Sequence, residues 1–399
     1  MVPRLILKAG KEKPILNGHP WVFSGAVKKI EGDPKIGQAV IVVSHDNTYL
    51  GMAAYSPHSQ IRARMWTLKS TTEVNEEFFN SRLRKAVKYR NALIDLGYIN
   101  RNAYRLVFSE SDYLPGLIVD QYANLLVVQF LTAGMEYWRE TIIEQLNNIT
   151  SIQTIYERSD GDVRNLEGLE SKVGWISGMS VQNPTQIIEN DIHFFVDYQQ
   201  GQKTGFYLDQ FENRKKIRHF LNDKKVLDCF SYTGGFSITS LVAKAKDVTA
   251  IESSANSIQL AQKNMELNNL NRSKCKWING DVFTELRKFR DADEKFDVII
   301  LDPPKFAATS SQIHRAARGY KDINLLALKL LIPGGILITF SCSGGISASL
   351  FQKIVNDASV DAGKRIRIIN RLHQASDHPV TTHFPESEYL KGLICQICE

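Results

Sequence analysis

The second half of the chain alternates short apolar runs with amphipathic stretches. This alternation begins near residue 187. Two of the apolar runs, Val298–Leu301 and Ile336–Ile338, are continuously apolar. Strands that are buried on both faces have this pattern. Because helical stretches separate the runs, the pattern predicts a doubly wound parallel α/β sheet. We expect its strands at Lys225–Phe230, Asp247–Glu252, Lys276–Gly280, Phe296–Asp302, Gly335–Ser341, Arg365–Ile369 and Leu390–Ile397.

The first segment has short apolar runs broken by Gly, Pro, Asp and Asn, which predicts a small β-barrel. In its last strand, Arg62 and Arg64 share a face because successive side chains alternate. We expect both guanidiniums on the outside of the barrel, where they would contact RNA phosphates. The predicted strands are Arg4–Leu7, Trp21–Ser24, Ala39–Val43, Tyr49–Ala54 and Ile61–Trp66.

A third segment lies between these two. It contains a predicted helix at Val74–Leu96, a hairpin formed by Leu117–Gln121 and Leu125–Phe130, and a helix at Met135–Asn148. This mixture predicts an α+β domain. We therefore divide the chain into three domains, at residues 1–75, 76–186 and 187–399.

The net charge of +6 is concentrated at one end of the chain. Residues 1–90 hold 15 Lys and Arg against 7 Asp and Glu, and the rest of the chain is nearly neutral. A localised positive field favours a nucleic-acid partner, although a merely solvated basic surface is an equal alternative. No apolar run reaches the roughly 18 residues that a membrane span needs, so we expect a cytoplasmic protein without membrane contact.

Residue types that bind a nucleoside follow the first three strands of the predicted sheet. Gly234 and Gly235 let a ligand approach the loop closely. Glu252 can accept hydrogen bonds from ribose hydroxyls, and Asp281 lies where it could contact an adenine amino group. The dinucleotide pattern G-x-G-x-x-G is absent, which favours S-adenosylmethionine without excluding NAD.

The ends of the next two strands carry candidate catalytic groups. Asp302-Pro303-Pro304 combines an acid with a stiff turn that fixes carbonyls toward a ligand. Cys342 follows the fifth strand beside glycines, where a thiolate could act as a nucleophile. The alternatives are a loop stiffener for the prolines and a small buried side chain for the cysteine.

Seven segments together resemble the bacterial ribosomal RNA large subunit methyltransferase I family. The resemblance covers essentially the whole chain. The segments are Gly201–Gln210, Cys229–Phe236, Asp302–Phe306, Arg318–Asn324, Phe340–Ser343, Asp377–Pro379 and Tyr389–Gly392.

This resemblance implies an N-terminal PUA RNA-binding domain, a central α+β domain and a class I (Rossmann-like) S-adenosylmethionine methyltransferase domain. It implies methylation of carbon 5 of a cytosine in 23S rRNA, with Cys342 as nucleophile and Asp302 at the ring-nitrogen edge of the base. Lys305 replaces a second cysteine found in other RNA cytosine methyltransferases, and we assign it to the RNA. The resemblance also implies a set of residues that bind the cofactor. They are Phe206, Tyr207, Asp209, Phe230, Ser231, Tyr232, Thr233, Gly234, Gly235, Phe236, Glu252, Asp281 and Asp302.

Three alternatives remain open at this point. Asp302-Pro303-Pro304 without a thiol would suffice for methylation of a base nitrogen. An NAD oxidoreductase and an RNA-binding assembly protein that lacks catalysis are the other two. The substrate would be 23S rRNA or a ribosome assembly intermediate. The oligomeric state is also open, with a homodimer as one alternative, and no metal site is expected.

Overall fold

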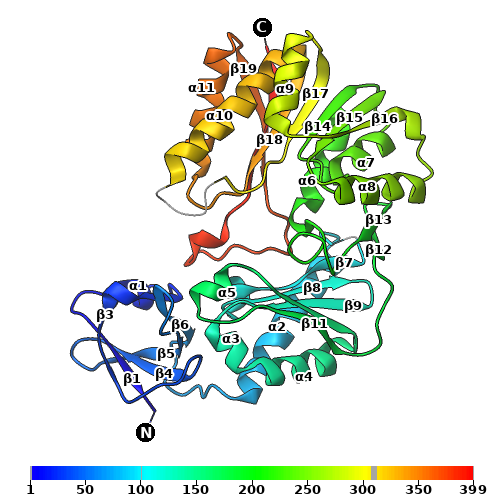
Figure 1. Ribbon diagram of the computed structural model, residues 1–399. Coiled ribbons are helices and arrows are strands. Elements are labelled where there is room, and N and C mark those ends of the chain that lie inside the picture. The colour runs from blue at the N-terminus through cyan, green and yellow to red at the C-terminus, as the bar shows by residue number, and fades with distance from the viewer. Residues whose placement is uncertain (1, 100, 307–311, 399) are drawn as a thin grey trace. The chain divides into compact units, whose positions relative to one another are not determined.

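The computed structural model describes residues 2–99, 101–306 and 312–398. The chain forms two compact units (Figure 1). Unit 1 comprises residues 1–187, 196–208 and 376–387, and unit 2 comprises residues 188–195, 209–375 and 388–399. The chain therefore first enters unit 2 near the predicted boundary at residue 187, but two later segments return to unit 1. Among the described residues, no helix has the length and apolar character to cross a membrane.

The N-terminal barrel of unit 1 is a six-stranded sheet in the order β2-β6-β5-β4-β1-β3. Its interior is filled by residues such as Leu5, Val40 and Met65. The sequence pattern located five strands but missed the short helix α1 (Lys13–Leu16) and the strand β3. The strands are β1 (Arg4–Leu7), β2 (Trp21–Phe23), β3 (Val27–Glu31), β4 (Ala39–Val43), β5 (Tyr49–Tyr55) and β6 (Ile61–Thr67).

The outer face of β6 is covered, which corrects the prediction for its two arginines. Arg64 is buried, and its Nη1 lies 2.7 Å from Glu167 Oε1 of the next domain. Trp66, on the same face, packs against Phe78 and Phe79. Arg64 does lie on the outer face of the barrel, but because another domain covers this face, the prediction that its guanidinium contacts RNA phosphates is wrong. Arg62 is half-buried, and its guanidinium donates to the carbonyl of Pro57.

The central part of unit 1 is a five-stranded sheet in the order β11-β10-β9-β8-β7, with the long helix α2 (Glu76–Asp95) and α4 (Arg139–Thr150) packed together. The predicted hairpin is present as β8 and β9, while the predicted helix at 135–148 is interrupted at Trp138. The elements are β7 (Ala103–Phe108), β8 (Leu117–Tyr122), β9 (Leu125–Phe130), α3 (Ala133–Tyr137), β10 (Ile155–Ser159), α5 (Val163–Leu166) and β11 (Lys172–Ser177). Beyond them, β12 (Thr185–Glu189) and β13 (Ile192–Val196) form a two-stranded sheet.

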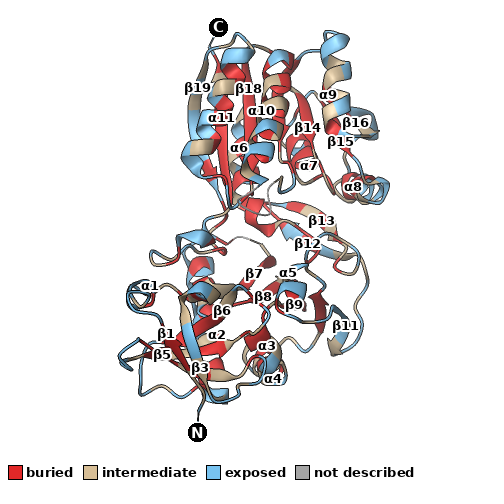
Figure 2. Ribbon diagram, turned by 60° about the vertical axis from the view of Figure 1, so that its left-hand side comes forward, coloured by how far each residue is buried: buried red, intermediate tan, exposed pale blue. Residues whose placement is uncertain are grey.

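Unit 2 contains a seven-stranded sheet in the order β16-β15-β14-β17-β18-β20-β19, with helices on both faces. Its central strands are buried, as the red strands in Figure 2 show. The first five strands are parallel and β20 is antiparallel to both of its neighbours. This is the predicted doubly wound sheet. Its strands are β14 (Lys225–Cys229), β15 (Asp247–Glu252), β16 (Cys275–Asn279), β17 (Phe296–Leu301), β18 (Leu331–Ser341), β19 (Ile366–His373) and β20 (Lys391–Ile397).

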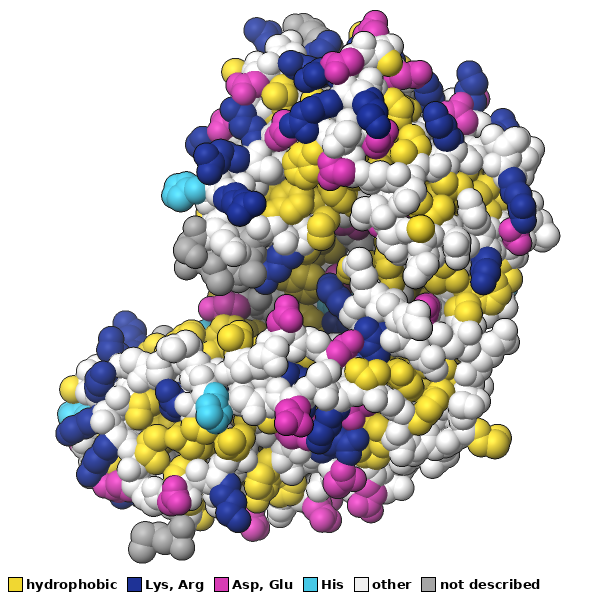
Figure 3. All heavy atoms as spheres, viewed as in Figure 1, with side chains coloured by type: hydrophobic (Ala, Val, Ile, Leu, Met, Phe, Trp, Pro, Cys, Tyr) yellow, Lys and Arg dark blue, Asp and Glu magenta, His cyan; other side chains and the backbone are white. Residues whose placement is uncertain are grey.

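Helix α6 precedes the seven-stranded sheet in the chain, and each of the other helices named below follows one of its strands. The core beneath α10 and α11 is apolar and contains Leu227, Leu301 and Phe351. The helices are α6 (Phe211–Ile217), α7 (Gly235–Val242), α8 (Ala255–Leu267), α9 (Val282–Asp291), α10 (Ile313–Leu330) and α11 (Ala348–Asp361). In the view of Figure 3, basic and acidic side chains are interspersed over this unit, whereas lysine and arginine gather at the edge of the barrel in unit 1.

The buried ion pair of the barrel generates a prediction about stability. Arg64→Ala would leave Glu167 charged and buried without its partner, which costs about 3–5 kcal/mol in comparable pairs. We expect a loss of this size in urea unfolding followed by tryptophan fluorescence. Arg62→Ala, on the same strand, should cost at most about 1 kcal/mol because it removes only hydrogen bonds to carbonyls. Equal losses for the two variants would contradict this account.

Candidate functional site

The candidate site lies at the carboxyl edge of the sheet in unit 2, where the strand order reverses. The chain passes from β14 to β15 and β16 on one side, and then to β17 and β18 on the other. Ligands of doubly wound sheets bind in the crevice at such a switch point. The segments that leave β14, β15, β17 and β18 at this edge carry most of the residues that the sequence singled out.

The loop after β14 is strongly bent. Phe230 and Tyr232 have left-handed φ values of 63° and 49°, and Gly234 has a φ of 83°. A Cβ atom at Gly234 would lie 3.0 Å from the Trp277 ring and 3.1 Å from Ala261. Glycine is therefore needed at this position both for backbone conformation and for space. The loop turns directly into α7, which begins at Gly235.

Glu252, at the end of β15, stabilises this loop through hydrogen bonds. Its carboxylate is buried and accepts hydrogen bonds from the Tyr232 N–H at 2.9 Å and the Ser254 N–H at 2.8 Å. The buried hydroxyls of Ser231 and Thr233 have no hydrogen-bond partner among the described residues. Because buried polar groups are nearly always paired, these hydroxyls point to a polar ligand in the loop.

Two aspartates lie near the ends of β14 and β17, of which Asp228 is buried and Asp302 is half-buried. Burial raises the pKa of Asp228 to about 7, although Ser237 Oγ donates to it at 2.5 Å. Burial, reinforced by the charges of Asp209 and Asp228, raises the pKa of Asp302 to about 7, while a hydrogen bond from Gln210 opposes the rise. Asp209 in turn accepts a hydrogen bond from the Tyr389 hydroxyl. The site thus holds carboxyl groups that keep a proton near neutral pH.

Cys342 directly follows β18 and is partly exposed. Its Sγ lies 3.9 Å from the carbonyl oxygen of Pro303, so the structure brings the thiol next to the Asp302-Pro303-Pro304 turn. The residue after it, Ser343, is fixed by the Tyr320 hydroxyl, whose oxygen lies 3.0 Å from Ser343 Oγ.

A buried lysine holds the same loop and was missed by sequence reasoning. Lys391 is paired with Ser341 across the antiparallel strands β18 and β20, and its Nζ donates to the carbonyls of Ser343 at 2.9 Å and Ile346 at 2.7 Å. Burial lowers the pKa of the Lys391 ammonium, and the nearby Cys342 sulfur opposes this change. A cation beside a thiol favours the thiolate.

Four of the predicted site residues occupy other kinds of position. Asp281 is exposed and caps α9, accepting from the Thr284 N–H at 2.9 Å. Phe206 and Tyr207 belong to unit 1, where the Tyr207 ring lies 4.7 Å from Lys203 Nζ and its hydroxyl donates to Gln202. Lys305 is exposed after the proline turn.

Asp228 is a second site residue that the sequence motifs did not identify. A carboxylic acid within the otherwise apolar strand Val226-Leu227-Asp228-Cys229 is the signal that could have identified it, because an unpaired buried carboxyl is costly unless it serves a function. Lys391 carried no such signal, since its approach to Cys342 depends on the pairing of two distant strands. Among the described residues, no group of His, Cys, Asp and Glu is arranged to hold a metal ion.

Comparison with known proteins gives matches over the whole chain. Residues 5–68 match a PUA-like domain, and residues 124–392 match an S-adenosylmethionine-dependent methyltransferase family. The chain is 46% identical over 397 residues to ribosomal RNA large subunit methyltransferase I from Klebsiella pneumoniae, covering 100% of this chain and 99% of that protein. It is 45% identical to the protein of the same name from an Escherichia coli O157:H7 strain, covering 100% of both.

A solved structure of a SAM-dependent methyltransferase from Streptococcus mutans superposes with a TM-score of 0.85, covering 99% of this chain and 100% of that one at 21% identity. A methyltransferase complexed with SAH gives the same TM-score, identity and coverage. These likenesses confirm the fold of the chain from end to end.

The raised pKa of Asp228 generates a prediction for pH-dependent stability. The folded state holds the Asp228 proton up to about pH 7, whereas a carboxyl with the ordinary value of 3.8 has already lost it. The stabilisation that the Asp228 proton gives the folded state is fully present below about pH 4 and is lost as the pH rises through 7. It amounts to a free energy of unfolding on the order of 4 kcal/mol. Asp228→Asn should therefore gain melting temperature relative to the parent between pH 4 and 7. A difference that is constant over this range would contradict the assignment.

The position of Lys391 generates a prediction about thiol reactivity. Lys391→Met removes the cation beside Cys342, so less thiolate forms at neutral pH. We expect the rate of Cys342 alkylation by iodoacetamide at pH 7 to fall severalfold, measured by peptide mass spectrometry. The exposed Cys398 in the same sample serves as the internal control, since its rate should not change. An unchanged Cys342 rate would show that Lys391 serves only to hold the loop.

Proposed function

Because the chain belongs to the ribosomal RNA large subunit methyltransferase I family, we propose that it methylates carbon 5 of a cytosine in 23S rRNA through a covalent bond to Cys342. The matches over the full length of both chains establish S-adenosylmethionine-dependent methylation of large-subunit rRNA. Carbon 5 as the methylated atom and the covalent route through Cys342 are the further parts that we propose. The observation that carries it is the partly exposed Cys342 thiol beside the Asp302-Pro303-Pro304 turn.

The loop after β14 fits the cofactor. S-adenosylmethionine supplies an electrophilic methyl group on a positively charged sulfur. Ser231 and Thr233 offer buried hydroxyls that need a partner, and Gly234 and Gly235 leave room for close approach of the ligand to the backbone. In this proposal Glu252 accepts hydrogen bonds from the ribose hydroxyls. Phe206, Tyr207, Asp209, Phe230, Tyr232, Phe236, Asp281 and Asp302 complete the cofactor residues that we propose.

Cys342 solves the chemical difficulty of the reaction. Carbon 5 of cytosine is too weak a nucleophile by itself to take a methyl group. In the proposed route the Cys342 thiolate adds to carbon 6, and the electron pair of the former double bond makes carbon 5 nucleophilic. After carbon 5 has been methylated, a base removes its hydrogen, the double bond reforms, and the thiolate leaves.

Asp302 would act on the cytosine ring, and Lys391 would act on the Cys342 thiolate. A carboxyl with a pKa of about 7 can present its proton to the ring nitrogen of the cytosine, where charge develops when the thiolate adds. Lys391 holds the loop that carries Cys342 and places positive charge near its sulfur. Lys305, exposed after the same turn as Asp302, is proposed to contact the RNA.

The substrate base must leave its stack to reach such a site. We therefore propose an unpaired or partly unfolded stretch of 23S rRNA, free or within an assembling ribosomal subunit, as the substrate. The cytoplasm, where this rRNA is found, is the expected place of action.

Replacement of Cys342 separates the proposed reaction from methylation of a nitrogen. Cys342→Ala should bind S-adenosylmethionine as tightly as the parent, because the thiol is not among the proposed cofactor contacts. Methyl transfer to a 23S rRNA transcript should fall by at least about 1000-fold, since nucleophilic activation of carbon 5 is lost. Binding is measured by calorimetry and transfer by mass spectrometry of nucleosides.

Retained transfer by Cys342→Ala, with the methyl group on a base nitrogen, would overturn the proposal in favour of the simpler chemistry of the Asp302-Pro303-Pro304 turn. A matched variant, Cys398→Ala, removes an exposed thiol elsewhere in the same unit and should leave transfer unchanged.

A further inference from the structure

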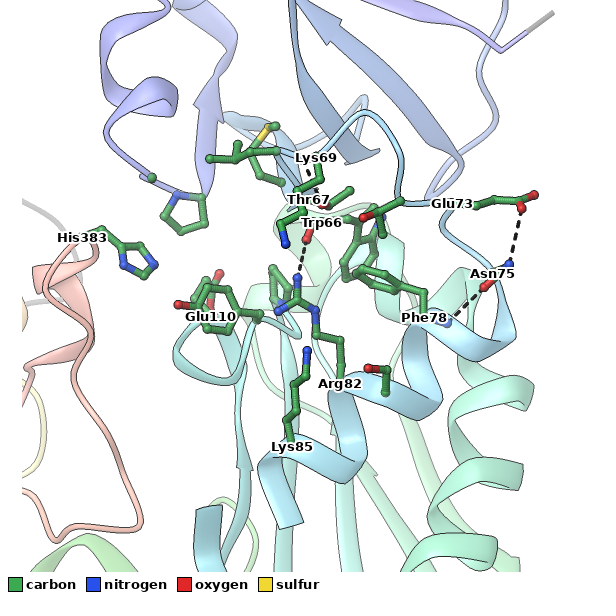
Figure 4. Close-up of a pocket in the computed structure, with 18 of the residues that line it drawn as sticks. Trp66, Thr67, Lys69, Glu73, Asn75, Phe78, Arg82, Lys85, Glu110 and His383 are labelled. Carbon is green, nitrogen blue, oxygen red and sulfur yellow. Dashed lines mark hydrogen bonds between the residues drawn. The ribbon is translucent and has the colours of Figure 1, made fainter. Parts of the chain in front are cut away.

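A large pocket lies within unit 1, and none of the residues that line it is assigned to the reaction. Its volume is about 870 Å³, and the turn after α1, the end of β6, the start of α2 and the loop that carries His383 line it (Figure 4). A pocket of this size accommodates a nucleotide or a small molecule. Barrel, central domain and the returning segment 376–387 all contribute to its wall, which is why no single stretch of sequence indicated it.

Arg82 is the unusual residue of this pocket. Among the described residues of unit 1, buried arginines pair with carboxylates, as Arg64, Arg90, Arg158 and Arg164 do. Arg82 is half-buried, yet among the described residues no carboxylate lies within ion-pair distance of it. Its guanidinium donates only to the carbonyl of Trp66, at 3.4 Å. Burial without a counter-charge lowers the pKa of Arg82.

A partly desolvated cation without a counter-charge is costly in a folded protein, and the cost is offset when a ligand supplies the negative charge. Lys85 lies one helical turn after Arg82 on α2, and Figure 4 shows both side chains directed into the same space. Lys69, after β6, is a third cation in the wall and, like Lys85, is exposed. Neither lysine forms an ion pair among the described residues.

The acidic residues of the wall do not neutralise this group. Glu110 accepts from the Trp21 indole N–H at 2.8 Å and lies 3.8 Å from Arg64. Figure 4 shows the Glu73 carboxylate turned away from Arg82, toward the Asn75 amide. Glu77 also lines the pocket, but it is exposed in the first turn of α2, and no ion pair joins it to Arg82.

Flat aromatic surfaces accompany these cations. Tyr113 is 46% exposed, and its ring stacks on His383 with centroids 5.6 Å apart and planes at 27°. The Arg82 guanidinium lies 4.8 Å from the centre of the Tyr113 ring. Guanidinium, phenol and imidazole thus form a stack beside the lysines. Cations that grip phosphate next to planes that receive an unpaired base are the features by which proteins bind single-stranded RNA.

We propose that this pocket binds single-stranded RNA, with a backbone phosphate on Arg82 and Lys85 and an adjoining unpaired base on the Tyr113–His383 stack. The pocket would anchor rRNA on unit 1 independently of the reaction at Cys342. RNA binding in this pocket does not depend on which atom of the rRNA is methylated.

The test measures RNA affinity against salt concentration, without cofactor, for the full-length chain and a short single-stranded RNA of mixed sequence. Each lost phosphate contact lowers the slope of log K against log salt by about 0.7 for single strands. We expect Arg82→Gln and Lys85→Gln each to weaken binding about tenfold at moderate salt and to reduce the slope by this amount. Arg82→Lys, which keeps the charge, should retain the slope.

Lys88→Gln is the matched control, because Lys88 is an exposed cation on the same helix outside the pocket. It should change neither affinity nor slope. Equal behaviour of Arg82→Gln, Lys85→Gln and Lys88→Gln would overturn the proposal, whether all three weaken binding or none does. Because no methyl transfer is read, failure of the proposed C5 chemistry leaves this result unaffected. An unchanged melting temperature shows that the variants fold.

Discussion

The parallel pairing of β17 with β18 is the constraint on which the proposed site depends. In this register Leu301 lies opposite Thr339, so the two strands end close together at the carboxyl edge of the sheet. Asp302-Pro303 therefore leaves the sheet beside Ser341-Cys342, and the sulfur comes to lie near the Pro303 carbonyl. A slip of one residue would turn these side chains to the opposite face. Burial of both strands on both faces, with Leu301 and Leu337 in the apolar core, holds the register.

The same edge concentrates groups that are expensive to bury. Asp228 and Asp302 keep their protons to about pH 7. The Lys391 ammonium is buried and donates to two carbonyls of the loop that follows Cys342. A fold selected only for stability would place apolar side chains here. Acids that are half-protonated near neutral pH, next to a cysteine with a neighbouring cation, are suited to proton transfer and covalent catalysis. The cost in stability thus supports a chemical role for this edge.

Much of the fold could be predicted from the pattern of apolar residues. The strands Ala39–Val43 and Asp247–Glu252 were located to the residue, because alternation and continuous burial leave clear local signals. Arg64 shows where such reasoning fails. Alternation along β6 correctly separates its two faces, but the sequence does not reveal that another domain covers the outer one. The roles of Lys391 and Arg82 could not be predicted from the sequence for a related reason. Their surroundings are assembled from segments that lie far apart in the chain.

The proposed bond between the Cys342 sulfur and a cytosine can be tested by trapping it. With 5-fluorocytosine at the target position, carbon 5 has no hydrogen for the base to remove, so the thiolate cannot leave after methylation. Mass spectrometry of the proteolysed complex should then find the methylated fluorocytidine attached to the peptide that contains Cys342. Methylation of a nitrogen of this base without any protein–RNA adduct, or an adduct on another residue, would contradict the account.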